Sequence, residues 1–185
     1  MLHMEEDDLA PRNVLIILLL GVIDRPISRF HLQKELFILT NVRPKLKELI
    51  NFDKHHMGVY SVELNELVDD LSVKEYIEIK DSKIRLNEKG KNCYKEIRNR
   101  YSYDEKFNDL LIKMKMIREL YDRLTIEEFA ILLYTRYEET IEGSTLIDRL
   151  DNNKKRKIIE DLYRKDYITK ERYKELLDNK ILFAV

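Results

Sequence analysis

Tryptophan is absent from the 185 residues, and cysteine, proline and glycine are scarce, at one, three and four residues. The single thiol, Cys93, excludes an intrachain disulfide, and with four histidines it leaves too few ligands for a cysteine-rich zinc module. So few glycines and prolines disfavour an all-β sandwich and a glycine-rich nucleotide-binding fold, because both depend on tight turns. A mainly helical protein is the expectation.

Long apolar runs are also missing. The longest one, residues 14–23, is about half of the roughly 20 residues that a membrane-spanning helix needs. Residues 5–8 are all acidic, whereas the start of a signal peptide is positively charged. We therefore expect no membrane association and a cytoplasmic location.

Charge is abundant and arranged in blocks. Charged residues make up 37% of the chain, and the net charge is only −1. Residues 9–58 hold eight basic and four acidic side chains, residues 59–72 hold four acidic and no basic ones, and residues 73–100 hold nine basic and five acidic ones. A polyanion would therefore meet favourable charge on some segments and repulsion on others.

Residues 9–100 follow the element order of a winged helix. Apolar spacing and capping residues predict helices over about 11–23, 28–39 and 61–71, the last two capped by Ser28 and Ser61. The period then changes to two: residues 76–80 and 83–86 alternate around a turn at Asp81–Ser82, which predicts a β-hairpin. Asn87 caps a fourth helix to about Tyr101. Three helices, a hairpin and a helix predict a mainly α fold, a winged helix-turn-helix with a short two-stranded β wing.

Residues 101–185 are predicted to form an all-helical extension. Its helices are expected to start at Ser102 with Glu105, at Thr125 with Glu128, near residue 152 and at Thr169. Gly143–Ser144 should end the second of them. Within the first, apolar residues recur at spacings of three and four, which predicts a homodimer seam, or alternatively a contact with the chain's own first domain. The seam residues are Phe107, Leu110, Met114, Ile117, Tyr121 and Leu124.

Three segments carry a family resemblance: RFHLQKELFIL at 29–39, HMGVYS at 56–61 and IRLNEKG at 84–90. They resemble the YwgA-like winged-helix proteins, which carry an R-x-x-L-Q-K-x-x-F-x-L helix, an H-x-G-P-Y-S entry to the third helix and an L-T-x-x-G end to the wing. Val59 stands where that pattern has proline, and Asn87 where it has threonine. The resemblance covers residues 12–92, and it implies binding of DNA or of a protein partner.

The charge pattern decides where DNA contact is expected. The outer face of the third predicted helix carries Glu63, Glu66, Asp69 and Asp70, which repel phosphate, so a basic wing is the better candidate. The start of that helix can hold one phosphate, or Ser61 merely caps it while Tyr60 packs. A solvated basic face is the alternative for the wing. The predicted DNA-binding residues are Tyr60, Ser61, Lys80, Lys83, Arg85 and Lys89.

The sequence thus predicts a double-stranded DNA-binding protein, a transcription regulator. The alternative is a non-enzymatic interaction module, antitoxin-like or an adaptor, that docks a protein partner through its acidic third helix. No catalytic motif is present, so we expect no enzyme, catalytic residue or cofactor. His31, His55 and His56 lack the spacing of a metal site, and we expect no metal.

Overall fold

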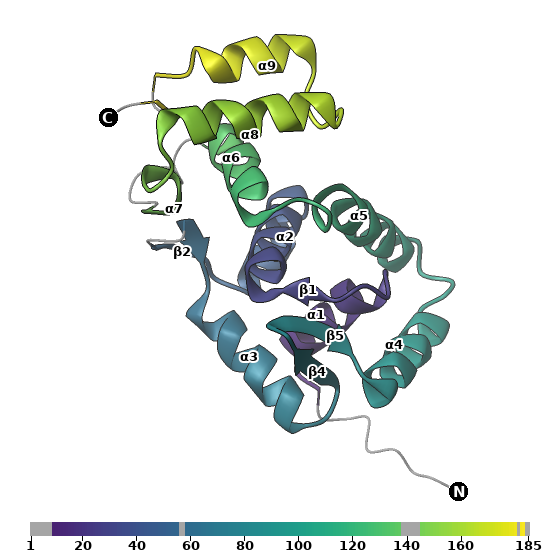
Figure 1. Cartoon of the computed structure of the whole chain (residues 1–185). Coiled ribbons are helices and arrows are strands. Elements are labelled where there is room, and N and C mark those ends of the chain that lie inside the picture. Colours follow the sequence, from purple (N-terminus) through teal and green to yellow (C-terminus); the bar gives the residue numbers. More distant parts are fainter. Residues whose placement is uncertain (1–8, 56–57, 138–144, 181, 184–185) are drawn as a thin grey trace, which may run out of the picture. The chain divides into compact units, whose positions relative to one another are not determined.

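The computed structural model describes residues 9–55, 58–137, 145–180 and 182–183 (Figure 1). The chain divides into two compact units, Met1–Phe52 with Ser61–Asp122 (the first unit) and Asp53–Tyr60 with Arg123–Val185 (the second unit). It is mainly α-helical, with a small three-stranded antiparallel sheet. None of the described helices combines the length and the apolar character needed to cross a membrane.

The first unit holds five α-helices and the sheet. Its helices are α1 (Pro11–Gly21), α2 (Arg29–Val42), α3 (Val62–Val73), α4 (Glu88–Arg100) and α5 (Glu105–Tyr121), with a 3₁₀ helix at Pro44–Glu48. Its strands are β1 (Ile27–Ser28), β4 (Ile77–Lys80) and β5 (Lys83–Leu86).

Helix α1 is the centre of this unit. It packs against α3, α4, α5 and β5, and every residue from Leu15 to Leu20 is buried. An almost wholly apolar helix is expected to be buried in this way, because it has no polar face to present to solvent.

The hairpin lies where the change of period predicted it. β4 and β5 pair antiparallel, with Ile77 opposite Leu86 and Ile79 opposite Ile84. A third strand that the sequence did not predict, β1, pairs with β5 through Ile27 and Ile84. Two residues are too few to show a periodic pattern, so this strand carries no sequence signal.

Helix caps explain where most elements begin. The side chains of Ser28, Ser61 and Asn87 each accept a hydrogen bond from a backbone N–H in the first turn, as predicted. Helix α5 differs from the prediction, because Asp104, rather than Ser102, accepts from the N–H groups of its first turn. The Ser102 hydroxyl instead donates to the carbonyl of Asn99, which keeps it in the turn that ends α4.

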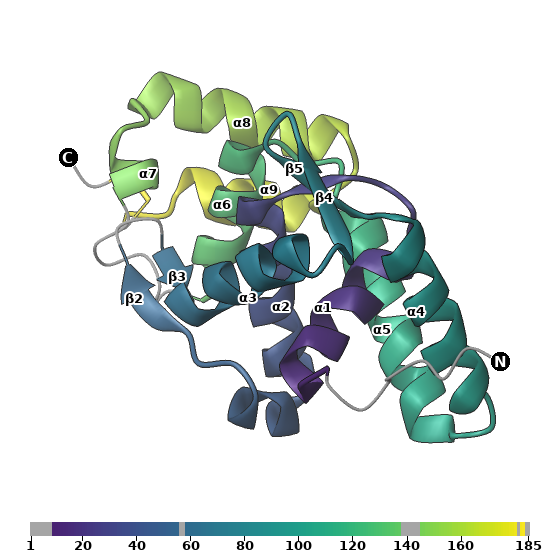
Figure 2. The same ribbon diagram turned by 90° about the horizontal axis from the view of Figure 1, so that it is seen from below.

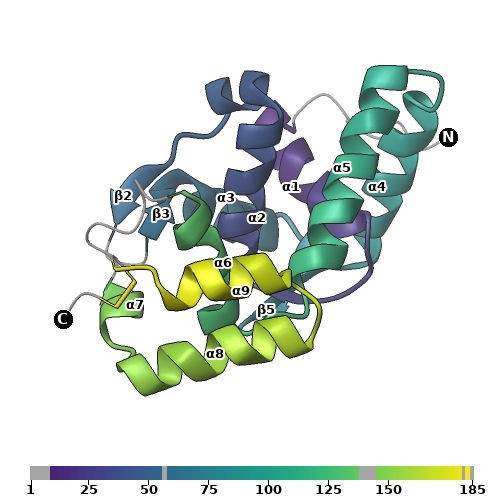
Figure 3. The ribbon, with the colours of Figure 1, turned by 90° about the horizontal axis from the view of Figure 1, so that it is seen from above.

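The second unit joins a small hairpin to four helices. The strands β2 (Asp53–His55) and β3 (Gly58–Tyr60) pair antiparallel, in a segment for which no strand was predicted. The helices are α6 (Ile126–Arg136), α7 (Thr145–Asp148), α8 (Asn152–Arg164) and α9 (Lys170–Leu177), of which α8 and α9 lie side by side (Figure 3). The predicted capping box of Thr125 and Glu128 is confirmed. The predicted break at Gly143–Ser144 lies outside the described residues.

Gly58 explains one part of the HMGVYS motif. Its φ of +82° is in the region that favours glycine, and a Cβ there would collide with the ring of Tyr134 in the same unit. This position is thus set by backbone conformation and packing.

The predicted dimer seam faces the chain's own core. Helix α5 packs against α1 and α2, and Met114 and Ile117 are buried there. Phe107, Leu110 and Tyr121 are partly exposed, and Leu124 belongs to the second unit. The middle of the seam is therefore an intrachain contact, because α1 and α2 already cover it. For the same reason the first unit extends to Asp122 and not to the predicted boundary at residue 100.

A buried arginine joins these helices. Arg118 of α5 is wholly buried, and its guanidinium donates to the carbonyls of Leu19 (2.8 Å) and Arg25 (2.7 Å) and to the carboxylate of Asp122 (2.7 Å). Arg25 also pairs with Asp122, at 3.1 Å. Arg118 thus satisfies carbonyls of the last turn of α1, which a helix end leaves without partners.

Glu35 of α2 places a second carboxyl beside this cluster. Its side chain is wholly buried, and its Oε2 lies 3.6 Å from the Arg118 Nε. Burial and then the negative charge of Asp122 raise the pKa of Glu35 well above its usual range, although Arg118 acts in the opposite direction. The protonated form, which can donate a hydrogen bond to Asp122, is therefore favoured in the folded chain.

Replacing Arg118 by methionine should lower the free energy of unfolding by about 3–5 kcal/mol, because it leaves buried carbonyls and Asp122 without their donor. Urea unfolding followed by circular dichroism measures this loss. Lys106→Met, at an exposed position of the same helix, is the control and should change little. Equal stability of the two variants would contradict the role given to Arg118.

Glu35→Gln should change how stability depends on pH. In the unfolded chain Glu35 loses its proton near its ordinary pKa of 4.5, whereas the folded chain holds it to higher pH. The free energy of unfolding of the wild type therefore includes a contribution from Glu35 that falls as pH rises between those two pKa values. In Glu35→Gln the amide does not titrate, so this contribution is lost. The stability of Glu35→Gln relative to wild type should rise with pH above about 4.5, until folded Glu35 also loses its proton, and urea unfolding over a pH series measures this. Glu66→Gln, at an exposed position, should show no such trend.

Candidate nucleic-acid interface

The tip of the β4–β5 hairpin carries two lysines directly opposite each other. Lys80 and Lys83 are cross-strand neighbours beside the turn, and both side chains are exposed. Neither forms an ion pair with any residue in the described part of the chain. Like charges in directly opposed positions destabilise a hairpin, and a bound anion relieves that repulsion. Figure 2 shows the hairpin as a narrow ribbon that ends in this turn.

The turn between the two lysines is strained. Asp81 and Ser82 have φ of 51° and 60°, the left-handed conformation that a two-residue hairpin turn needs at both central positions. Glycine or asparagine is usual there, and a side chain such as that of Ser82 costs energy. The turn nevertheless matches the twist of the strands, which holds the two lysines opposite each other.

The other two predicted wing cations are engaged within the chain. Arg85 forms an ion pair with Glu78, its cross-strand neighbour. The Lys89 ammonium donates to the carbonyl of Lys74 at 2.9 Å and lies 4.4 Å from the centre of the Tyr76 ring. Less of the charge on these two residues is available to a phosphate than the sequence suggested.

The start of α3 is built as a cap. The Ser61 hydroxyl accepts from the N–H of Leu64 at 3.2 Å, while the backbone N–H and carbonyl of Ser61 both bond the buried amide of Gln33. Ser61 is 2% exposed, so a phosphate does not reach these groups. Tyr60 is partly exposed and belongs to the second unit. Of the two alternatives for Ser61, phosphate binding and helix capping, the structure thus shows capping.

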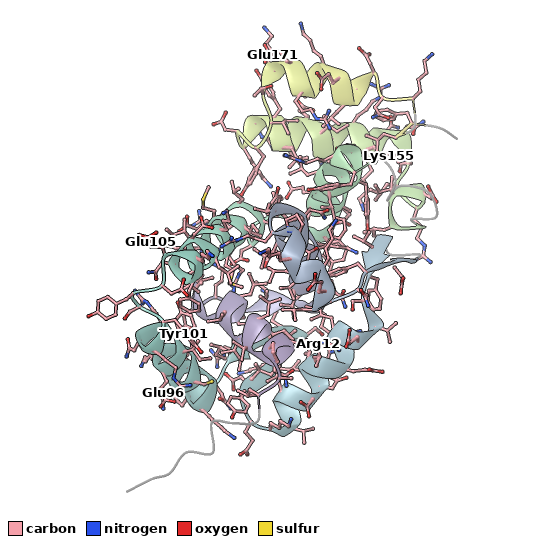
Figure 4. All side chains as sticks on the ribbon, turned by 180° about the vertical axis from the view of Figure 1, so that it is seen from behind. Arg12, Glu96, Tyr101, Glu105, Lys155 and Glu171 are labelled. Carbon is pink, nitrogen blue, oxygen red and sulfur yellow. The ribbon has the colours of Figure 1, made fainter. Side chains whose placement is uncertain are left out.

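The acidic face of α3 is largely paired within the first unit. Glu63 pairs with Arg12, whose side chain is labelled in Figure 4, Asp69 pairs with Arg29, and Asp70 pairs with Lys74 at 3.0 Å. The inward residues Leu64, Val68 and Leu71 are buried, as the spacing predicted. The pairs with Arg12 and Arg29 could not be predicted from spacing, because those partners lie far away along the chain.

Helix α2 carries a buried lysine that adds nothing to the exposed basic surface. Lys34 is 1% exposed, and its ammonium lies 5.0 Å from the centre of the Phe30 ring. Burial lowers the pKa of Lys34 to about 7. The ammonium group of Lys34 is therefore shielded from solvent, and it is only partly protonated near neutral pH.

Metal binding receives no support from the described residues. Among them, no three side chains of histidine, cysteine, aspartate or glutamate come together around a possible ion. His31 bonds the hydroxyl of Ser28 at 2.8 Å. The placement of His56 and of the His55 side chain lies outside the description.

Comparison with known proteins assigns the chain to no family. No protein-family model matches the chain, and no curated protein matches it. The likeness to the YwgA-like proteins stays a prediction from the motif residues.

Ser82→Gly should stabilise the chain by about 1 kcal/mol, because glycine adopts a positive φ without the steric cost that a side chain brings. Thermal unfolding measures this as a higher Tm. The matched control, Ser72→Gly, makes the same chemical change inside α3 and should destabilise by about 0.5–1 kcal/mol. A lower Tm for Ser82→Gly would contradict the assignment of strain to the turn.

Proposed function

We propose that the first unit is a winged-helix domain whose wing is the β4–β5 hairpin, and that it binds double-stranded DNA as a transcription regulator. The order α1, β1, α2, α3, β4, β5, α4 supports the domain type, since a winged helix has three helices followed by a hairpin. The motif residues of α2 and of the hairpin end support it independently.

The observation that carries DNA binding is the pair Lys80 and Lys83. Two exposed ammonium groups in cross-strand register, with no ion pair to the described residues, offer two contacts to a phosphate backbone. Such contacts position a protein on DNA but do not read its sequence. The proposed mode is therefore backbone binding led by the wing.

Helix α3 has a different role in this proposal. Its ion pairs with Arg12 and Arg29 reduce the repulsion between its acidic face and phosphate, so the helix does not prevent approach. It still presents no basic side chain in its interior turns, and we assign it no reading of the major groove.

The same ion pairs weaken the alternative function. A protein-interaction module that docks a basic partner needs free carboxylates on α3, and Glu63, Asp69 and Asp70 are already paired. Glu66 remains exposed on that face. A single carboxylate gives a basic partner little to bind.

The test is a gel shift with a linear DNA duplex over a salt series from 50 mM to 200 mM. The double variant Lys80→Ala/Lys83→Ala should bind more weakly at 50 mM salt. The slope of log affinity against log salt should become less steep by about 1.8, because two phosphate contacts are lost.

The matched control is Lys170→Ala/Lys174→Ala, which removes two exposed lysines of α9 and makes the same change in net charge. It should leave affinity and slope close to wild type. Equal losses in both double variants would show a nonspecific charge effect and overturn the wing assignment. No binding by the wild type at 50 mM salt would overturn the function itself.

A further inference from the structure

A groove in the first unit lies between α4 and α5, beside the end of α1. Its volume is about 410 Å³, within the size range of small-molecule sites. Figures 2 and 3 show the two helices side by side. Tyr101 and Glu105, labelled in Figure 4, mark the turn that joins them.

Three of the residues that line this groove are apolar. Val22 follows α1, and Leu111 and Ile112 belong to α5. Ile112 is 60% exposed, and Met116 and Leu120 continue the same helix face at 56% and 50% exposure. Residues four apart lie one above another, so this apolar stripe runs for about 12 Å along α5.

Two polar residues of α4 also line the groove. Tyr94 and Arg98 are one turn apart on α4, and neither makes an ion pair or a side-chain hydrogen bond to the described residues. Burial raises the pKa of Tyr94, so its hydroxyl keeps its proton and remains a donor. The Tyr94 ring packs over Gly21, where any side chain would collide with it.

A second cation faces the groove from α5. Lys115 lines it and forms an ion pair with Glu119, one turn further along α5, at 3.8 Å. The lining thus combines two cations, the Tyr94 hydroxyl and the amide of Asn108, which donates to the carbonyl of Ser102 at 2.8 Å, with three apolar side chains and no carboxylate. This combination is complementary to one negative charge on an apolar body.

We propose that the groove binds an amphiphilic carboxylate, a small molecule with one carboxylate group and an apolar chain or ring. Arg98 and Tyr94 hold the carboxylate, Lys115 adds positive charge to the lining, and Val22, Leu111 and Ile112 pack against the apolar part. The site is separate from the wing tip and goes beyond the proposed DNA binding. Because α4 begins one residue after β5, a ligand held on α4 contacts the element that continues the wing.

Decanoate is the probe, added to the full chain and followed by isothermal titration calorimetry and by methyl NMR of labelled isoleucines. One saturable site is expected, with a shift of the Ile112 δ1 methyl resonance. Ile79, which is also partly exposed but lies on the hairpin, should not shift. Arg98→Ala should weaken the affinity about tenfold, the usual effect of losing one charge-assisted hydrogen bond.

The matched control is Lys95→Ala, which removes an exposed cation from the same helix outside the groove. It should leave the affinity unchanged. An equal loss in Lys95→Ala, equally tight binding of the uncharged decanol, or an unmoved Ile112 resonance would each overturn the proposal. Because none of these measurements uses DNA, failure here is distinguishable from failure of the wing assignment.

Discussion

The first unit depends on the guanidinium of Arg118. It is wholly buried, and its donors bind the end of α1, the loop before β1 and the side chain of Asp122. A planar cation with five N–H groups can satisfy acceptors in several directions, which a lysine cannot do. With Glu35 of α2 beside it, three helices meet around one charge. Burying charge is costly without such partners, so the cluster fixes the register of α5 against α1 and α2.

This cluster also explains why the middle of the apolar repeat on α5 is buried within the chain. An apolar repeat with spacings of three and four fits a second copy and the chain's own core equally well. Once Arg118 is buried against α1, Met114 and Ile117 on neighbouring turns point inward as well. The outward face is then the stripe of Ile112, Met116 and Leu120, which leads into the groove beside α4.

Residues other than glycine adopt the left-handed backbone conformation at several turns. Glu75 and Asp166 adopt positive φ after α3 and α8, and each helix ends with a backbone bond from the next residue, Tyr76 N–H to Leu71 and Tyr167 N–H to Leu162. In the hairpin turn, Asp81 and Ser82 also adopt positive φ. Left-handed backbone is thus present without glycine, at a local cost that packing offsets. In the hairpin, the strained turn keeps Lys80 and Lys83 opposite each other.

Much of the local structure could be predicted from the amino-acid pattern alone. Capping residues and the change of period near Tyr76 indicate where helices and the hairpin begin, because hydrogen bonds and alternation act within a few residues. The capping residues are Ser28, Ser61, Asn87, Thr125 and Thr169. Which charged groups pair over a long range depends on the tertiary structure. Arg12 and Arg29 pair with Glu63 and Asp69, which lie far away along the chain, so no spacing rule predicts these contacts. The Glu78–Arg85 pair, in contrast, follows from the register of the hairpin, and it distinguishes Arg85 from the exposed lysines at the hairpin tip. The groove between α4 and α5 likewise arises only when Val22, Tyr94 and Ile112 come together, since its lining is drawn from three separate segments.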